Sequence, residues 1–206
     1  MKTLLTFAFI FCIAVMLIAG CSNNGDGVVN DVPNTDIFPL GDNNSWTYMQ
    51  YFYNSDGILT DSTEGMITVV GTETIDSDKV FLVEGIDGDT LIMGGGQTGL
   101  WVYPVGGFSQ LYIPYPVNVG DSVIFTFDNG ITWASCVCES IDDTVYLSMG
   151  TYVCWKYKET PYYDPAHIYY YYFYPTIGLM QRDDWRMDVS PEYIERRLKL
   201  IDYTVD

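Results

Sequence analysis

Residues 65–86 read GMITVVGTETIDSDKVFLVEGI, which is two runs of β-forming residues joined by a polar turn. Valine, isoleucine, threonine and phenylalanine favour strands, and only the residues Asp76 to Lys79 separate the two runs. A connection this short joins antiparallel strands, because a parallel pair needs a crossover of about a dozen residues or more. The stretch therefore predicts an antiparallel hairpin with strands over 65–75 and 80–86.

Similar runs, bounded by glycine, aspartate and asparagine, continue on both sides of this hairpin. Beyond residue 36 we find almost no helical periodicity. We expect further strands over residues 45–54, 90–93, 100–103, 110–113, 122–127, 131–139, 144–148, 151–160 and 168–174. The short connections predict an all-β fold, a single curved antiparallel sheet or flattened half-barrel built as a meander of hairpins.

The C-terminal segment 190–203 has two interpretations. Its first residues, Ser-Pro-Glu, suit the start of a helix, and apolar residues follow at helical spacing. As a strand, the segment places Ile194, Leu198 and Leu200 on one face, with Arg196 as the misfit on that face. The β-rich surroundings favour the strand, which we expect to close the sheet.

Composition and charge limit the class of protein. The chain has 206 residues, of which 48% are hydrophobic and 16% aromatic, enough to bury a core and to exclude disorder over most of its length. There are 27 acidic and 9 basic residues, giving a net charge of −18. A nucleic-acid partner is therefore not expected, because phosphate backbones require a basic surface.

The first residues have the features of an export signal. Lys2 is followed by an apolar run over 3–18, and small residues precede Cys21 in the sequence Ile-Ala-Gly-Cys. This segment resembles the lipobox of bacterial lipoproteins; a transmembrane helix or an ordinary secretory peptide are the alternatives. The resemblance implies cleavage before Cys21, lipidation of its thiol and anchoring to a membrane of the bacterial cell envelope. The outer membrane is favoured, because Ser22 stands where proteins retained in the inner membrane often have aspartate.

These features divide the chain into three parts. We expect a signal peptide over 1–20, a flexible tether rich in Gly, Asn and Asp over 21–36, and a single β domain over 37–206. Residues 21–150 carry 18 acids and one base, whereas residues 151–206 carry 9 acids and 7 bases. The mature chain thus has an acidic body, which an anionic membrane surface would repel, and a nearly neutral, aromatic C-terminal third.

A second resemblance rests on the order of several short motifs. The motifs are Phe38-Pro39-Leu40, Asn44-Ser45-Trp46-Thr47-Tyr48, Val119-Gly120-Asp121, Thr144-Val145, Gly150-Thr151-Tyr152, Tyr174-Pro175-Thr176-Ile177-Gly178-Leu179 and Leu198-Lys199-Leu200. In this order they resemble a set of uncharacterised secreted bacterial lipoproteins with "PL..GN.W.Y" and "Y..PGVGL" segments. The resemblance implies a curved antiparallel sheet, like the half-barrel of envelope lipid carriers, and implies no activity.

Two features that elsewhere indicate catalysis or cofactor binding are better explained structurally. The cluster at 94–99 matches GxGxxG, but the residues after it, LWVYP, are β-like and provide no helix N-terminus for a pyrophosphate, so we expect a glycine-rich turn or bulge. His167 is the only histidine and no GxSxG motif is present, so we expect it to lie at a strand end or on the surface. A zinc site would lack ligands, and we expect no metal, cofactor or catalytic residue.

Pairs of acidic residues are the remaining basis for an enzymatic alternative. Paired carboxylates serve in glycoside hydrolysis, and aspartate-rich turns can bind calcium, but no twelve-residue calcium loop is present. We expect all of the pairs at turns, where aspartate is favoured. The pairs are Asp76 with Asp78, Asp87 with Asp89, Asp142 with Asp143 and Asp183 with Asp184.

Three cysteines remain after Cys21 and the discarded Cys12. Cys136 and Cys138 are two residues apart in one predicted strand and therefore point to the same face. Export permits oxidation, so we expect a disulfide from Cys154 to Cys136 or Cys138. The alternative is three small, buried, reduced side chains.

The tyrosine-rich stretch is the candidate binding face. Side chains alternate between the two faces of a strand, so one aromatic face of 169–174 lines the core, and the other lines a ligand or is covered. The candidate ligand face consists of Tyr169, Tyr170, Tyr171, Tyr172, Phe173 and Tyr174, together with Trp46, Trp101 and Trp155. We therefore expect a lipid-anchored envelope protein that acts as a non-catalytic binding or structural module for a glycan, lipid or protein ligand. The alternative is a glycan-directed envelope hydrolase using paired carboxylates.

Overall fold

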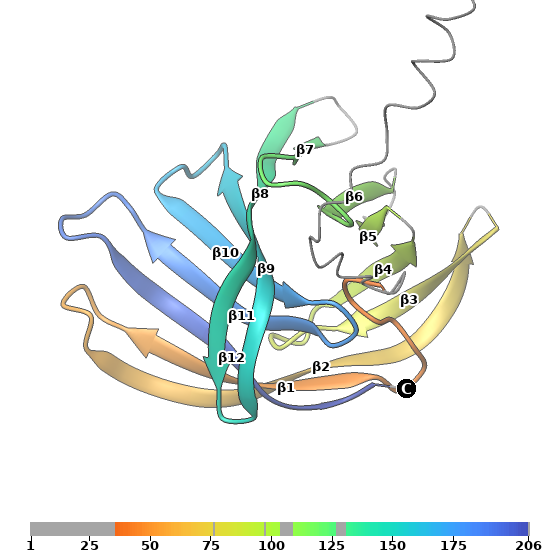
Figure 1. Ribbon diagram of the computed structural model, residues 1–206, viewed down its shortest axis with the longest axis horizontal. Coiled ribbons are helices and arrows are strands. Elements are labelled where there is room, and N and C mark those ends of the chain that lie inside the picture. Colours follow the sequence, from red (N-terminus) through yellow and green to blue (C-terminus); the bar gives the residue numbers. More distant parts are fainter. Residues whose placement is uncertain (1–35, 76, 97, 104–108, 127–130, 206) are drawn as a thin grey trace, which may run out of the picture. The chain divides into compact units, whose positions relative to one another are not determined.

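A computed structural model of the protein describes residues 36–75, 77–96, 98–103, 109–126 and 131–205. The described residues form twelve strands in one sheet (Figure 1). The strands are β1 Ser45–Tyr53, β2 Leu59–Ile75, β3 Asp78–Glu84, β4 Thr90–Gly96, β5 Gly99–Val102, β6 Gln110–Pro114, β7 Ser122–Thr126, β8 Thr132–Leu147, β9 Gly150–Pro161, β10 His167–Tyr174, β11 Gly178–Arg186 and β12 Tyr193–Thr204. No helix in this part of the chain is long and apolar enough to cross a membrane. The signal peptide, Cys21 and nearly all of the tether lie outside the described residues.

The sheet is an antiparallel meander with one long-range closure. The strand order is β6-β5-β4-β3-β2-β1-β12-β11-β10-β9-β8-β7. All pairs are antiparallel, and β1 pairs with β12 so that Trp46 lies opposite Tyr203. The sheet edges are therefore β6 and β7, which are consecutive in the sequence, and Figure 1 shows the sheet curling until it is nearly closed into a barrel. The predicted fold class is confirmed, and the C-terminal segment is a strand as expected.

Most predicted strands are present, with corrected bounds. Strand β2 begins at Leu59 and not at residue 65, because a tight turn after β1 allows pairing to resume at once. In this turn the Asn54 side chain accepts hydrogen bonds from two backbone N–H groups, and Gly57 has φ +71°. Residues 131–139 and 144–148, predicted as two strands, are one strand, β8. Two register shifts between Cys138 and Asp143 accommodate the polar residues that suggested a break.

One strand was missed. Residues 178–186, GLMQRDDWR, form β11, although the sequence predicted a turn at Asp183 and Asp184. That prediction is wrong, as is the turn predicted at Asp142 and Asp143, which lie within β8. Aspartate is usually unfavourable in strands. In β11, arginines of the neighbouring strand and of β11 itself neutralise the two carboxylates, which makes the two aspartates tolerable there.

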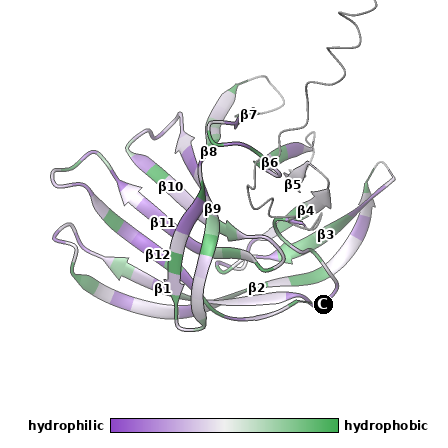
Figure 2. Ribbon diagram, in the orientation of Figure 1, coloured by the Kyte–Doolittle hydropathy of each residue, from purple (hydrophilic) through white to green (hydrophobic). Residues whose placement is uncertain are grey.

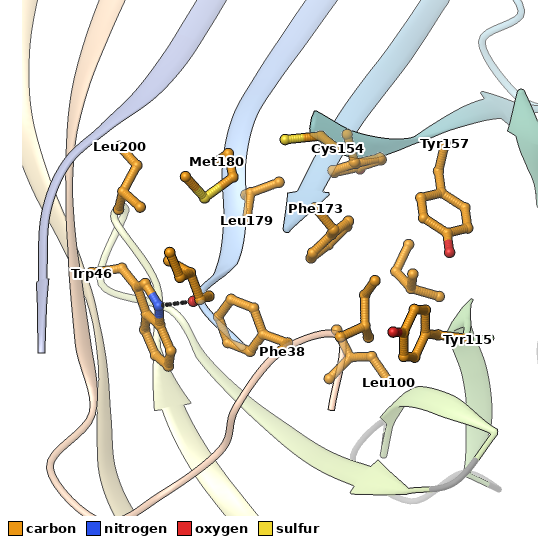
Figure 3. Packing of buried hydrophobic residues seen from close by; sticks show 14 of the residues in the cluster. Phe38, Trp46, Leu100, Tyr115, Cys154, Tyr157, Phe173, Leu179, Met180 and Leu200 are labelled. Carbon is orange, nitrogen blue, oxygen red and sulfur yellow. Dashed lines mark hydrogen bonds between the residues drawn. The ribbon is translucent and has the colours of Figure 1, made fainter. Parts of the chain in front are cut away.

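Apolar and polar residues alternate along the strands (Figure 2), and the inward-facing residues form the core. In the part of the core shown in Figure 3, the Trp46 indole N–H donates a 2.5 Å hydrogen bond to the Ile177 carbonyl, and Phe38 stacks on the indole with ring centroids 4.3 Å apart. Gly178 has φ +107°, and a Cβ at this position would lie 2.6 Å from a Phe38 ring carbon. Only glycine fits here, and its small size lets the turn between β10 and β11 pack against Phe38 and Trp46.

Candidate functional site

The concave side of the sheet encloses a cavity of about 920 Å³. This volume lies within the range of about 300–1,000 Å³ that is typical of small-molecule pockets. Most of the lining is apolar and comes from strands on both sides of the sheet closure: Ile67, Val83, Leu91, Met93, Leu100, Val102, Phe125, Trp133, Phe173, Leu179 and Leu198. Such a surface favours an apolar occupant, because water makes few hydrogen bonds to it.

A group of charged residues interrupts this apolar lining on β11 and β12. The carboxylate of Asp184 is buried and accepts hydrogen bonds from the Nε atoms of Arg182, at 2.7 Å, and Arg196, at 2.8 Å. Both arginines line the cavity, and their side chains keep about a quarter of their surface exposed. Register explains the grouping, because Asp184 lies opposite Arg196 in the β11–β12 ladder and cross-strand partners point to the same face.

Two aspartates lie where the β3–β4 turn borders the cavity. Asp87 and Asp89 are both among the lining residues, and the Asp87 carboxylate is 3.9 Å from a terminal nitrogen of Arg196. The predicted turn at this pair is confirmed. Because the Asp87 side chain is 74% exposed, solvent screens its attraction to Arg196 and the pair is weak.

Gln50 places an unsatisfied polar atom at the cavity. The residue is only 5% exposed and lines the cavity, and its Oε1 atom has no hydrogen-bond partner. A buried polar atom without a partner costs about 1–3 kcal/mol. A ligand that bonds to Gln50 would remove this cost. Gln50 lies opposite Leu198 in the β1–β12 ladder, so it is a diagonal neighbour of Arg196 on the same face.

A buried glutamate bridges three strands beside the cavity. The Oε2 atom of Glu159 in β9 accepts hydrogen bonds from the hydroxyls of Tyr171, at 2.8 Å, and Tyr112, at 3.0 Å. Desolvation by burial raises the pKa of Glu159, while the hydrogen bonds from the two tyrosines oppose the rise. Tyr112 belongs to the edge strand β6, so this carboxyl group connects the edge of the sheet to β9 and β10.

The structure divides the predicted aromatic face between two sides of β10. Tyr171 and Phe173 line the cavity, and Tyr169 is stacked near the guanidinium of Arg182, 4.8 Å from its ring centroid. Tyr170 and Tyr172 face the opposite side of the sheet, where Lys156 lies 4.5 Å and 5.9 Å from their ring centroids.

The remaining predicted aromatic residues do not line the cavity. Trp46 is buried in the core, Trp101 donates to the Thr98 hydroxyl, and Trp155 packs edge-on against Tyr115. Tyr174 packs edge-on against Tyr152. The nine candidate residues therefore do not form one surface.

The three cysteines are free and buried in this structure, so the predicted disulfide is not formed. Cys138 lies opposite Tyr157, and Cys154 is three residues farther along β9, which corresponds to about 10 Å. This separation is beyond disulfide reach, which requires Cα atoms within about 7 Å. Cys136 and Cys138 both join the core, as expected for residues two apart in a strand.

His167 and the glycine cluster have structural surroundings. His167 begins β10, as expected, and its ring nitrogens contact Asp164 at 2.5 Å and Glu195 at 3.2 Å. Gly96 and Gly99 face each other across the tight β4–β5 hairpin, so the predicted glycine turn is confirmed. Among the described residues, no three histidine, cysteine or acidic side chains cluster in a way that could hold a metal ion.

The sequence interpretation missed Arg182, Arg196 and Gln50 as cavity residues. One signal for Arg196 was present, because a strand over the C-terminal segment places this arginine on the apolar face beside Leu198. A charged residue at an inward position of a strand indicates either a buried ion pair or a binding site. Arg182 gave no such signal, since β11 itself was not predicted.

Comparison with known proteins identifies no family for the chain. No family of known proteins matches the sequence, and no curated protein matches it either. Two solved structures are similar in fold. One is a protein from Bacteroides fragilis that is inferred to be exported and has a YmcC-like fold, and the other is a protein from Parabacteroides distasonis that is inferred to be a lipoprotein. Each is 14% identical and aligns over 82% of this chain and 99% of its own length, with TM-scores of 0.48 and 0.41, respectively.

Proposed function

We propose that this protein is a lipid-anchored component of the bacterial cell envelope, with the outer membrane favoured, that acts as a non-catalytic binding protein. The cavity on the concave side of the sheet holds a mainly apolar small molecule. The observation that carries the proposal is the size and apolar lining of this cavity.

The acidic residues support binding better than the hydrolase alternative. Glycoside hydrolysis needs two carboxyl groups on opposite sides of the scissile bond, about 5–10 Å apart. Asp87 and Asp89 border the cavity from one turn, on the same side. Glu159 and Asp184 are buried and engaged by tyrosine hydroxyls and arginines, and neither lines the cavity.

Binding of a neutral fluorescent probe, N-phenyl-1-naphthylamine, tests the proposal. The chain from residue 22 onward is suitable, because it contains all twelve strands and the core, and lacks the apolar N-terminal run that would itself bind the probe. We expect saturable binding at one site. Val102→Trp, which places an indole in the cavity, should abolish saturable binding; Val153→Trp adds the same bulk at an exposed position of β9 and should leave binding intact.

Circular dichroism and thermal unfolding establish that both variants are folded. If Val102→Trp does not fold, Met93→Trp fills the same cavity from β4. Absence of saturable binding to the unmodified chain, or equal binding by a folded cavity-filling variant, would contradict the proposal.

A further inference from the structure

From the charged residues in the cavity we infer that the ligand is a single-chain amphiphile whose head is an oxyanion, bound by Arg196 and Gln50. A long-chain fatty acid is the simplest such molecule. The inference rests on the proposed function, and specifies which end of the ligand contacts which residues.

Arg196 has unused hydrogen-bond donors inside the cavity. A guanidinium group has five N–H donors, and Arg196 uses its Nε–H toward Asp184. Its terminal nitrogens make no hydrogen bond to any residue that the structure describes; one of them lies 3.9 Å from the Asp87 carboxylate. These nitrogens can therefore bind a carboxylate or phosphate in the bidentate geometry that guanidinium favours.

The local charge also favours an anion, although the whole chain is acidic. Two arginines, Arg182 and Arg196, share the single buried carboxylate of Asp184, so these three side chains together carry one net positive charge. Arg182 holds Asp184 through two of its nitrogens, so it fixes the carboxylate and leaves Arg196 free to turn toward a ligand. Asp87 and Asp89 are the competing carboxylates, and both lie on an exposed turn.

Gln50 provides the second contact on the same face. Its unpartnered amide oxygen can accept from a hydroxyl of the ligand head, and rotation of the amide would instead offer N–H donors to the oxyanion. Gln50 and Arg196 lie on adjacent strands, so that one head group can contact both.

The rest of the cavity lining determines which kind of tail the ligand has. Beyond the residues of β11, β12 and Gln50, the wall is formed mainly by aliphatic and aromatic side chains from β2 to β8 and from β10. A ligand with one charged end and an apolar body satisfies both regions, whereas a sugar would leave its hydroxyl groups without partners along the apolar wall.

Displacement of N-phenyl-1-naphthylamine by matched ligands tests the inference. The ligands are oleate, oleyl phosphate and oleyl alcohol, which share one chain and differ in the head group. At about pH 8 we expect at least one of the two anions to bind about tenfold tighter than the alcohol, as hydrogen bonds to a charged group predict. The comparison of oleate with oleyl phosphate identifies which oxyanion the site prefers.

Substitutions locate the head group. Arg196→Met should remove the preference for the anion while leaving the affinity for oleyl alcohol unchanged. Arg186→Met is the matched control, because Arg186 is paired with the exposed Asp188 and does not line the cavity; it should retain the preference. Asp87→Asn, on the exposed turn, should strengthen anion binding by roughly twofold by removing the competing carboxylate.

The outcomes separate this inference from the proposed function. Equal affinity for the alcohol and both anions, or a preference that persists in folded Arg196→Met, overturns the inference while the proposed function stands. Failure of the unmodified chain to bind the neutral probe overturns the proposed function itself. Should Arg196→Met fail to fold, unchanged anion affinity in Asp87→Asn overturns the inference.

Discussion

The side-chain amide of Gln110 in the edge strand β6 bonds both backbone groups of Thr126 in the other edge strand, β7. Its Nε2 donates to the Thr126 carbonyl, and its Oε1 accepts from the Thr126 N–H at 3.2 Å. Next to this contact, Tyr112 stacks on Phe125 with ring centroids 5.2 Å apart. One glutamine therefore links the two edge strands, between which no backbone ladder is formed. Gln110, Tyr112 and Phe125 all line the cavity.

Removal of this amide should weaken the junction between the edge strands. We expect Gln110→Ala to lower the free energy of unfolding by about 1–3 kcal/mol, because two hydrogen bonds are lost at a partly buried site. Urea unfolding measures the loss, and amide hydrogen exchange should become faster in β6 and β7 first. Ser122→Ala, at an exposed position of β7, is the control; equal effects of the two substitutions would argue against a junction made by Gln110.

The raised pKa of Glu159 predicts how stability depends on pH. Above the ordinary pKa of a glutamate and below the raised one, the folded protein binds more protons than the unfolded chain, so the free energy of unfolding decreases as pH rises through this window. Glu159→Gln removes that ionisation, and we expect the variant to gain stability relative to the unmodified chain as pH rises above about 4.5. Thermal unfolding across this window, with exposed Glu192→Gln as the control, measures the difference. A difference that is constant with pH would contradict the assignment.

The Asp183–Arg197 pair should be important for stability, because the Asp183 side chain is only 3% exposed. Arg197 donates to both of its oxygens, at 2.6 and 2.8 Å. Arg197→Met leaves this charge without its main partner and should cost about 3–5 kcal/mol, and the double variant with Asp183→Asn should recover part of the loss. Chemical denaturation of the two single variants and the double variant measures the coupling. Additive losses would mean that the two side chains do not depend on each other.

The buried thiols should react slowly in the folded protein. Desolvation by burial raises the pKa of Cys154 to about 12 and raises the pKa values of Cys136 and Cys138 as well, so little thiolate is present at neutral pH. In the chain from residue 22 onward, titration with a thiol reagent should give three thiols after unfolding without reductant, and slow reaction before unfolding. A single reactive thiol in the unfolded, unreduced protein would restore the disulfide that the strand register disfavours.

Local patterns were sufficient for the hairpins. Alternation in β1 and the turn residues between β2 and β3 are properties of short stretches, and the structure places both where the sequence predicts strands. The alternative of a C-terminal helix failed because β12 pairs on both sides, with β1 and β11, and these pairings outweigh local helix signals.

The missed strand and the missed site have the same physical cause. In β11, Asp183 and Asp184 point to opposite faces, and each is neutralised by an arginine of β12. Neither face of β11 shows an apolar pattern over these residues, so only the long-range pairing makes the segment a strand. Arg182, Arg196 and Gln50 meet at one wall because β1 and β11 both pair with β12, a closure that short-range sequence patterns do not predict.

Whether the cavity holds a mainly apolar ligand is tested most directly by a crystal structure of the chain from residue 22 onward with a fatty acid brominated at the end of its chain. We expect an anomalous bromine peak inside the cavity, among apolar residues such as Val83, Met93 and Val102. Bromine peaks confined to the outer surface of the sheet, with the cavity occupied only by water, would contradict it.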